Sequence, residues 1–183
     1  MQRRDFLLGA GASAALGTAT ARAADGQPVV RWRLASSYPK SLDPLYGASE
    51  VLANRVAALT GGRFQIRPFA AGEIVPGLQA LDAVQQGTVE CGHTLGSFYV
   101  GKNRAFAFDS VLPFGLTTRQ QTAWMHFGNG LTLLRELYRD YGVINFPGGN
   151  TGAQMGGWFR KELQGLADLK GLKMRIPGLG GEI

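Results

Sequence analysis

Cys91 and His93 have the residue types and the spacing from which a nucleophile and its base could be built. They lie two residues apart in a predicted strand, so their side chains would share one face of it. A catalytic pair also needs direct hydrogen-bond reach and a third, orienting group, which neighbours on one strand rarely supply. We therefore expect Cys91 to be a small buried residue and His93 a satisfied polar one, and His126 to pack beside Trp124.

Arg175 could do a different kind of chemistry. It is the lone charge in Met174-Arg175-Ile176-Pro177, near the carboxyl end of a predicted strand. Ligands of open α/β sheets gather outside such strand ends. A guanidinium there suits a bidentate grip on a carboxylate. A structural ion pair or an exposed edge charge would use the same residue, so both interpretations stay open at this point.

The sequence lacks the motifs and the composition that are typical of several other classes of protein. With two histidines and one cysteine, the chain has neither a zinc-ligand spacing nor a disulfide framework. We find no G-x-S-x-G, H-E-x-x-H or P-loop pattern. The net charge of +6 is scattered over single residues, which does not predict a nucleic-acid-binding stripe. A hydrophobic fraction of 45% and a charged fraction of 17% over 183 residues indicate a folded chain.

The elements that must position these side chains alternate in type. We predict strands at 29–34, 64–68 and 89–95, with helices at 44–59 and 76–86 between them, Asp43 capping the first helix and Gly61-Gly62 ending it. This alternation is typical of a parallel sheet covered by helices. A loop-rich aromatic stretch follows, then helices over 117–141 broken near 128–130. Further strands are predicted at 143–146, 154–159 and 172–176.

The two ends of the chain carry their own predictions. Arg3-Arg4 before Phe6-Leu7, a Gly/Ala-rich stretch and Ala21-Arg22-Ala23 resemble a twin-arginine export signal over 1–23 with its cleavage site. An N-terminal anchor helix is the alternative. At the other end, Gly180-Gly181 stands where a helix would begin. We therefore expect the N-terminal portion of a longer protein or a truncated gene product.

Three blocks carry a family resemblance. The segments Trp32–Pro39, Phe69–Pro76 and Asp168–Pro177, with the leader, resemble the extracytoplasmic solute-binding proteins of TRAP transporters. The segment Asn150–Phe159 resembles the branch that binds 2-oxo acids and similar monocarboxylates. Members of the family are about twice as long as this chain. The resemblance implies an α/β, two-lobed periplasmic-binding-protein-like fold, with lobe one mostly present over 24–148 and lobe two begun but truncated over 149–183.

The resemblance also implies a site and its partners. Arg175 would clamp the carboxylate of a small organic acid anion, a 2-oxo or 2-hydroxy acid, and Gln154 would contact both the ligand and a bound cation, sodium or a divalent ion. Asn150 belongs to the same binding motif. Tyr99 would form a lobe-one wall of the pocket, with Tyr38 and Trp158 as weaker candidates. The protein would act in the periplasm with integral membrane subunits of the transporter, with a homodimer of the full-length protein among the alternatives.

Two other functions remain as alternatives. One is an exported enzyme that uses Cys91 or His93, against which the absence of any base–nucleophile motif counts. The other is an exported truncation that binds nothing. We expect no enzymatic activity and no nucleic-acid partner.

Overall fold

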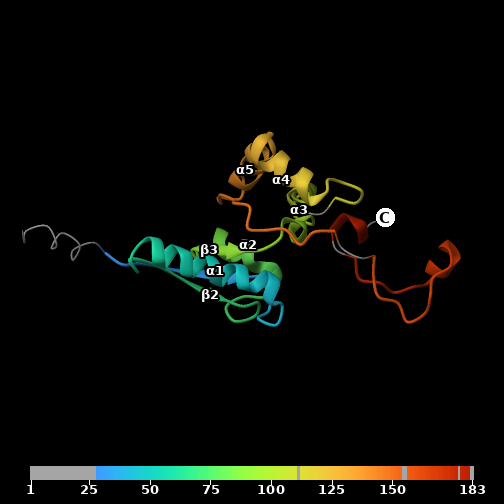
Figure 1. The fold of residues 1–183 in the computed structure, drawn as a ribbon, viewed down its shortest axis with the longest axis horizontal. Coiled ribbons are helices and arrows are strands. Elements are labelled where there is room, and N and C mark those ends of the chain that lie inside the picture. Colours follow the sequence, from blue (N-terminus) through green and yellow to red (C-terminus); the bar gives the residue numbers. More distant parts are fainter. Residues whose placement is uncertain (1–27, 111, 154–155, 177, 182–183) are drawn as a thin grey trace, which may run out of the picture.

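A parallel sheet forms the base of the molecule. The computed structural model describes residues 28–110, 112–153, 156–176 and 178–181, and within them the strands are β1 (Val30–Ser36), β2 (Phe64–Phe69) and β3 (Cys91–His93). The strand order is β2-β1-β3, and both pairings are parallel (Figure 1). Leu34 in the middle strand pairs with Pro68 on one side and Cys91 on the other. The predicted alternation of strands and helices is confirmed.

Helix α1 (Asp43–Leu59) connects β1 to β2. Its N-cap is Leu42, whose carbonyl accepts from the backbone N–H of Tyr46, so the prediction of Asp43 as the cap is wrong by one residue. Proline in the first turn costs nothing, because its missing N–H would have no helical partner there. The helix ends before Gly61 and Gly62, as predicted, and both have positive φ.

Helix α2 (Ala80–Gln85) follows a 3₁₀ turn, η1 (Gly77–Gln79), and covers the opposite face of the sheet from α1. The evidence is two consecutive residues of β3. His93 is hydrogen-bonded to Ser49 of α1, whereas a side chain at Gly92 would meet Val84 of α2. Successive strand residues point to opposite faces. The sheet is therefore covered by one helix on each side.

A second layer of short helices stands above the sheet (Figure 1). It comprises η2 (Gly96–Tyr99), η3 (Arg104–Phe106), α3 (Ala107–Ser110), α4 (Thr118–Phe127) and α5 (Gly130–Arg139). The predicted break between the last two helices is confirmed. Any side chain at residue 130 would collide with the ring of Trp124, 2.6 Å from the Cβ position. The core of this layer consists of Leu81, Tyr99, Phe106, Met125, Leu134 and Tyr138.

The chain beyond residue 142 differs from prediction. The described residues of 143–146, 154–159 and 172–176 form no strand, so those three strand predictions are wrong as far as the structure describes them. Only two 3₁₀ turns occur among the described residues there, η4 (Leu166–Leu169) and η5 (Gly178–Gly181). A strand is stable only when a neighbour pairs with its backbone. Within the described residues, no other segment pairs with these three.

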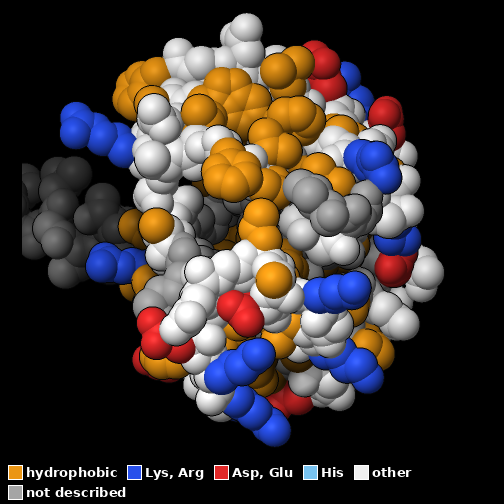
Figure 2. Space-filling view, turned by 90° about the vertical axis from the view of Figure 1, so that its right-hand side faces the viewer, with side chains coloured by type: hydrophobic (Ala, Val, Ile, Leu, Met, Phe, Trp, Pro, Cys, Tyr) orange, Lys and Arg blue, Asp and Glu red, His pale blue; other side chains and the backbone are white. Residues whose placement is uncertain are grey.

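Apolar side chains are exposed on the face where the chain ends. Figure 2 shows hydrophobic side chains gathered on the upper part of this face, at the height of α3–α5 in Figure 1. The loop between α3 and α4 contributes exposed Leu112, Phe114 and Leu116. Phe114 is fully exposed and has a φ of 56°, which an L-residue with a bulky side chain seldom adopts. A second packing layer would bury such a surface.

Candidate functional site

The sheet topology indicates where a ligand would be expected to bind. The chain leaves β1 toward β2 on one side and returns to β3 on the other, with α1 and α2 on opposite faces. Between such strands the connections diverge and leave a crevice outside the carboxyl ends, which is where open α/β sheets bind ligands. Here Ser36, at the end of β1, pairs with His93, at the end of β3, so a ligand site of this kind would lie beyond the carboxyl ends of these two strands.

A chain of hydroxyl groups, formed by Ser37, Thr94 and Tyr99, lies at this end of the sheet. The Oγ of Ser37 lies 2.6 Å from both the Gly77 carbonyl and the Oγ1 of Thr94. The same Oγ1 lies 2.7 Å from the Tyr99 hydroxyl, which also accepts from the Leu81 backbone N–H at 3.1 Å. The hydroxyl chain therefore ties the ends of β1 and β3 to η1 and α2.

Tyr99 is consequently a core residue of the helical layer. It is 2% exposed, and its ring packs edge-on against Phe106. Its hydroxyl is already used by Thr94 and Leu81. The predicted role as a pocket wall stays a prediction, and the burial gives a sufficient structural reason for the residue. Tyr38, the weaker candidate, is also buried and stacks edge-on with His93.

Arg175 lies on exposed, irregular chain and not on a strand. Within the part of the chain that the structure describes, its guanidinium has no hydrogen bond or ion pair. Figure 1 shows the segment that carries it running away from the helices and returning near α3. The return point is Gly178, whose Cβ position would be 3.3 Å from the Cβ of Ser97 in η2.

The other predicted residues lie along the same segment. The Oδ1 of Asn150 accepts from the Thr118 hydroxyl at 2.9 Å and from the Gly152 backbone N–H at 2.7 Å, so this side chain ties the segment to the start of α4. Trp158 is 91% exposed. Gln154 lies outside the described residues. The ligand-binding roles of Asn150, Gln154 and Arg175 stay predictions.

The side chains of Cys91 and His93 have structural roles. Burial raises the pKa of the Cys91 thiol to about 11, and its Sγ faces the Arg33 carbonyl at 3.7 Å. The Nδ1 of His93 lies 2.8 Å from the Ser49 hydroxyl, and burial lowers the pKa of the imidazole. Each side chain is thus neutral at pH 7 and has its own partner. The expectation that neither is a catalytic group agrees with this geometry.

Two polar residues of the helical layer were not predicted. The carboxyl of Asp109 accepts from the Tyr138 hydroxyl at 2.7 Å, and burial raises its pKa. Its Oδ2 would be 2.4 Å from a Cβ at Gly96, so that position has room only for glycine. Ser97 is 2% exposed, and its hydroxyl has no hydrogen-bond partner in the described chain. An acid isolated among aromatic residues, as in Phe106–Ser110, could have indicated the burial of Asp109.

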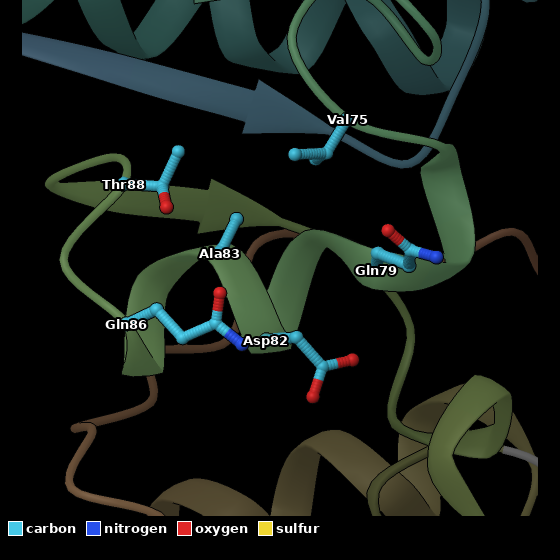
Figure 3. Close-up of a pocket in the computed structure, with 6 residues that line it drawn as sticks. All are labelled: Val75, Gln79, Asp82, Ala83, Gln86 and Thr88. Carbon is cyan, nitrogen blue, oxygen red and sulfur yellow. The ribbon is translucent and has the colours of Figure 1, made fainter.

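A hollow of about 300 Å³ lies elsewhere, against α2 (Figure 3). Its polar lining includes Gln79, Asp82 and Gln86, and the Asp82 carboxylate is paired with Lys102 at 2.6 Å. None of the predicted site residues lines it.

The described residues do not bring three His, Cys, Asp or Glu side chains together as a metal centre would require. No helix in the described ranges is both long enough and apolar enough to cross a bilayer.

Comparison with known proteins identifies a family. The family described as "Bacterial extracellular solute-binding protein, family 7" (DctP) matches residues 35–182. A "Monocarboxylate 2-oxoacid-binding periplasmic protein" of Nostoc sp. is 59% identical over 166 residues, which are 91% of this chain and 45% of that protein. The chain therefore spans less than half the length of this relative.

Solved structures show the same similarity. A TRAP transporter solute-binding protein from Bordetella bronchiseptica, a mixed-occupancy dimer with calcium and picolinate in the occupied site, is 55% identical with a TM-score of 0.82. The alignment covers 85% of this chain and 46% of that one. A TRAP periplasmic solute-binding protein from Colwellia psychrerythraea, with bound calcium and pyruvate, is 40% identical with a TM-score of 0.81, covering 84% and 47%. One from Pseudoalteromonas atlantica, with sodium and pyruvate, is 44% identical with a TM-score of 0.79, covering 84% and 47%.

These findings decide several of the expectations. The predicted family and the α/β fold with a parallel sheet are confirmed, with the chain matching under half of each neighbour. The family consists of solute-binding proteins, which confirms that this chain is not an enzyme. The lobe boundary at 148 and the leader over 1–23 stay predictions.

Proposed function

Because this chain belongs to family 7 of the bacterial extracellular solute-binding proteins, we propose that it provides lobe one and the entry to lobe two of a TRAP transporter's solute-binding subunit. This subunit captures a small 2-oxo or 2-hydroxy monocarboxylate in the periplasm and delivers it to the integral membrane subunits. Capture needs no covalent chemistry, since preformed polar groups in a cleft suffice.

One observation carries the proposal: the exposed guanidinium of Arg175, without an ion-pair partner among the described residues, lies three residues before the contact of Gly178 with Ser97. Three residues of chain span at most about 10 Å, so Arg175 is tethered close to Ser97 in η2. An arginine fork binds the two oxygens of a carboxylate in one plane. Arg175 is accordingly the clamp for the ligand carboxylate.

The relatives' ligands support a narrower ligand class. Pyruvate and picolinate, which occur with a metal cation in the three solved neighbours, share one feature. Each has a carboxylate and a second donor on the adjacent carbon, a keto oxygen in one and a ring nitrogen in the other. Such a pair can chelate a hard cation in a five-membered ring. The proposed ligand of this protein is therefore a carboxylate with a donor atom at the α position.

The cation would be shared. The described residues contain no group of three or more His, Cys, Asp or Glu side chains that could hold a metal ion, and in this proposal the ligand itself supplies part of the coordination. Gln154, which lies outside the described residues, supplies a side-chain amide oxygen, a donor type that calcium accepts in proteins. Sodium and calcium are the candidate ions, as in the solved neighbours.

A calorimetric titration with matched acids tests the ligand class. The full-length gene product that contains this sequence should bind pyruvate and picolinate in buffer with sodium and calcium. Propionate lacks the keto oxygen and nicotinate carries its ring nitrogen one position farther away, so both should bind at least tenfold more weakly. Chelation of calcium together with replacement of sodium should weaken the binding of pyruvate and leave the binding of propionate unchanged. Equal affinity for picolinate and nicotinate would contradict the proposal.

Export is proposed through the twin-arginine signal over 1–23, with cleavage after Ala23. N-terminal sequencing of periplasmic material should find Ala24 first, and uncleaved protein in the cytoplasm would contradict this route.

Co-purification with the transporter's membrane subunits tests the proposed partner. The relative from Bordetella bronchiseptica is described as a dimer, so light scattering of the full-length gene product tests whether it also forms one.

A further inference from the structure

Ser97 carries a buried hydroxyl group that lacks a hydrogen-bond partner. The residue is 2% exposed, and among the residues the structure describes nothing is bonded to its Oγ. Its backbone is fixed, because the Ser97 N–H donates to the Oγ of Ser110 at 2.9 Å. Almost all buried hydroxyl groups in proteins have a partner, and those that do not call for an explanation.

The position of Ser97 supplies that explanation. It stands in η2, four residues after the end of β3, beyond the carboxyl end of the strand, which is the end of the sheet where open α/β folds bind their ligands. The neighbouring hydroxyls of Thr94 and Tyr99 are both occupied in the hydroxyl chain. Of the hydroxyls of Thr94, Ser97 and Tyr99, that of Ser97 is therefore the one without a hydrogen-bond partner in the described chain.

The segment that bears Arg175 comes to the same place. Gly178 packs against Ser97, with 3.3 Å between its Cβ position and the Cβ of Ser97. Gly178 also has a φ of 59°, so a side chain there would be both strained and crowded. A glycine with these two constraints indicates that the close approach of this segment to η2 is built into the chain.

We propose that the Ser97 hydroxyl is a hydrogen-bond donor to the carboxylate that Arg175 holds, a contact from lobe one opposite the clamp. The inference rests on the proposed function and takes the same ligand class, a small monocarboxylate anion. Ligand binding would then give the buried hydroxyl its missing acceptor. A hydrogen bond to a charged group is among the stronger ones in proteins, so its loss is measurable.

The test compares Ser97→Ala with Ser49→Ala in the full-length gene product. Ser49 is equally buried, at 2%, but its hydroxyl is already bonded to His93 at 2.8 Å. Each variant is titrated with pyruvate and melted without ligand. Ser97→Ala should weaken pyruvate binding by about tenfold or more while its melting temperature without ligand stays equal or rises, because no hydrogen bond is lost. Ser49→Ala should show the reverse, a lower melting temperature and unchanged affinity.

A third variant checks the donor role. Ser97→Cys keeps a single γ atom, a somewhat larger one, and offers only a weak donor, so its pyruvate affinity should lie between those of wild type and Ser97→Ala. Wild-type affinity in Ser97→Ala, or a melting temperature lowered as in Ser49→Ala, would overturn the assignment while leaving the proposed function intact. Absence of pyruvate binding in the wild type would overturn the proposed function and this assignment with it.

Discussion

The Tyr138 hydroxyl donates a 2.7 Å hydrogen bond to Oδ2 of Asp109, joining α5 to α3. Burial raises the pKa of this carboxyl above its ordinary value, and the bond from Tyr138 opposes that rise. An acid with a raised pKa in the folded state binds its proton more tightly there than in the unfolded chain. Its contribution to stability is therefore complete below the ordinary pKa and is lost as pH rises through the folded pKa.

Asp109→Asn should remove this pH dependence. The amide oxygen still accepts from Tyr138, so at pH 7 the free energy of unfolding should remain within about 1 kcal/mol of wild type or exceed it. The difference between variant and wild type should shift in favour of the variant as pH rises from 4 to 7. Urea unfolding at a series of pH values measures this. Tyr138→Phe is the control, because removing the donor raises the pKa further and should cost about 1 kcal/mol at pH 7.

Cys91 should react slowly with thiol reagents. Its pKa of about 11 in place of 9.0 lowers the thiolate fraction at pH 8 by roughly a hundredfold. Modification by a disulfide reagent should therefore be at least a hundredfold slower in the folded protein than in urea. Cys91→Ala should leave pyruvate affinity unchanged. Rapid modification in the folded state would revive an active-thiol interpretation.

The chain from 149 to 176 should be the first site of proteolysis. Its described residues are mostly exposed and form no strand, and an ion pair of 3.9 Å between Lys161 and Asp168 is one of its few side-chain contacts. Residues 28–148, in contrast, contain the sheet and the packed helices. When residues 1–183 are expressed alone, trypsin should cleave first after Arg160, Lys161, Lys170 or Lys173. Initial cleavage at Arg55 within α1 or at Arg139 within α5 would contradict this.

Sequence patterns predicted the elements between residues 30 and 139 well because these elements are stabilised locally. Gly61 and Gly62 end α1 in left-handed conformations, and the break at Gly128–Gly130 is set by the nearby ring of Trp124. The face of α1 was harder to predict. Its leucines and valines recur at helical spacing, yet Leu52 and Leu59 are exposed and a neighbouring stripe is buried. The buried face of α1 is the one that contacts the sheet, and the periodicity of a single helix does not show which face makes that contact.

The candidate site was less predictable from sequence. Arg175 was expected on a strand, but β structure at 172–176 depends on a partner strand that the described residues do not provide. Local residue pattern carries no information about whether such a partner is present. Ser97 and Asp109 were missed for a related reason. A polar residue reveals its burial only when segments distant in sequence pack around it, as Gly178 does on Ser97.

Gln154 should couple ligand and cation. If its amide oxygen coordinates the ion beside the ligand, Gln154→Ala should weaken the binding of both pyruvate and calcium. By linkage, pyruvate and calcium must change each other's affinity by the same factor. Gln154→Glu adds a charge that favours the cation and disfavours an anionic ligand. Titrations of each partner at two fixed concentrations of the other measure the coupling. Pyruvate affinity in the wild type that is independent of calcium and sodium would remove the cation bridge.

Arg175→Ala should weaken pyruvate binding in the full-length gene product by at least tenfold. A hydrogen bond to a charged group contributes roughly 1.5–3 kcal/mol, and about 1.4 kcal/mol corresponds to one decade in Kd. Arg175→Lys should restore little, because an ammonium lacks the planar fork that holds both carboxylate oxygens. Lys173→Ala is the matched control, since it removes the same charge two residues away from an equally exposed position. Its pyruvate affinity should stay close to that of wild type. An equal loss of affinity in both variants would mean that Arg175 attracts the anion only through its charge and does not clamp it.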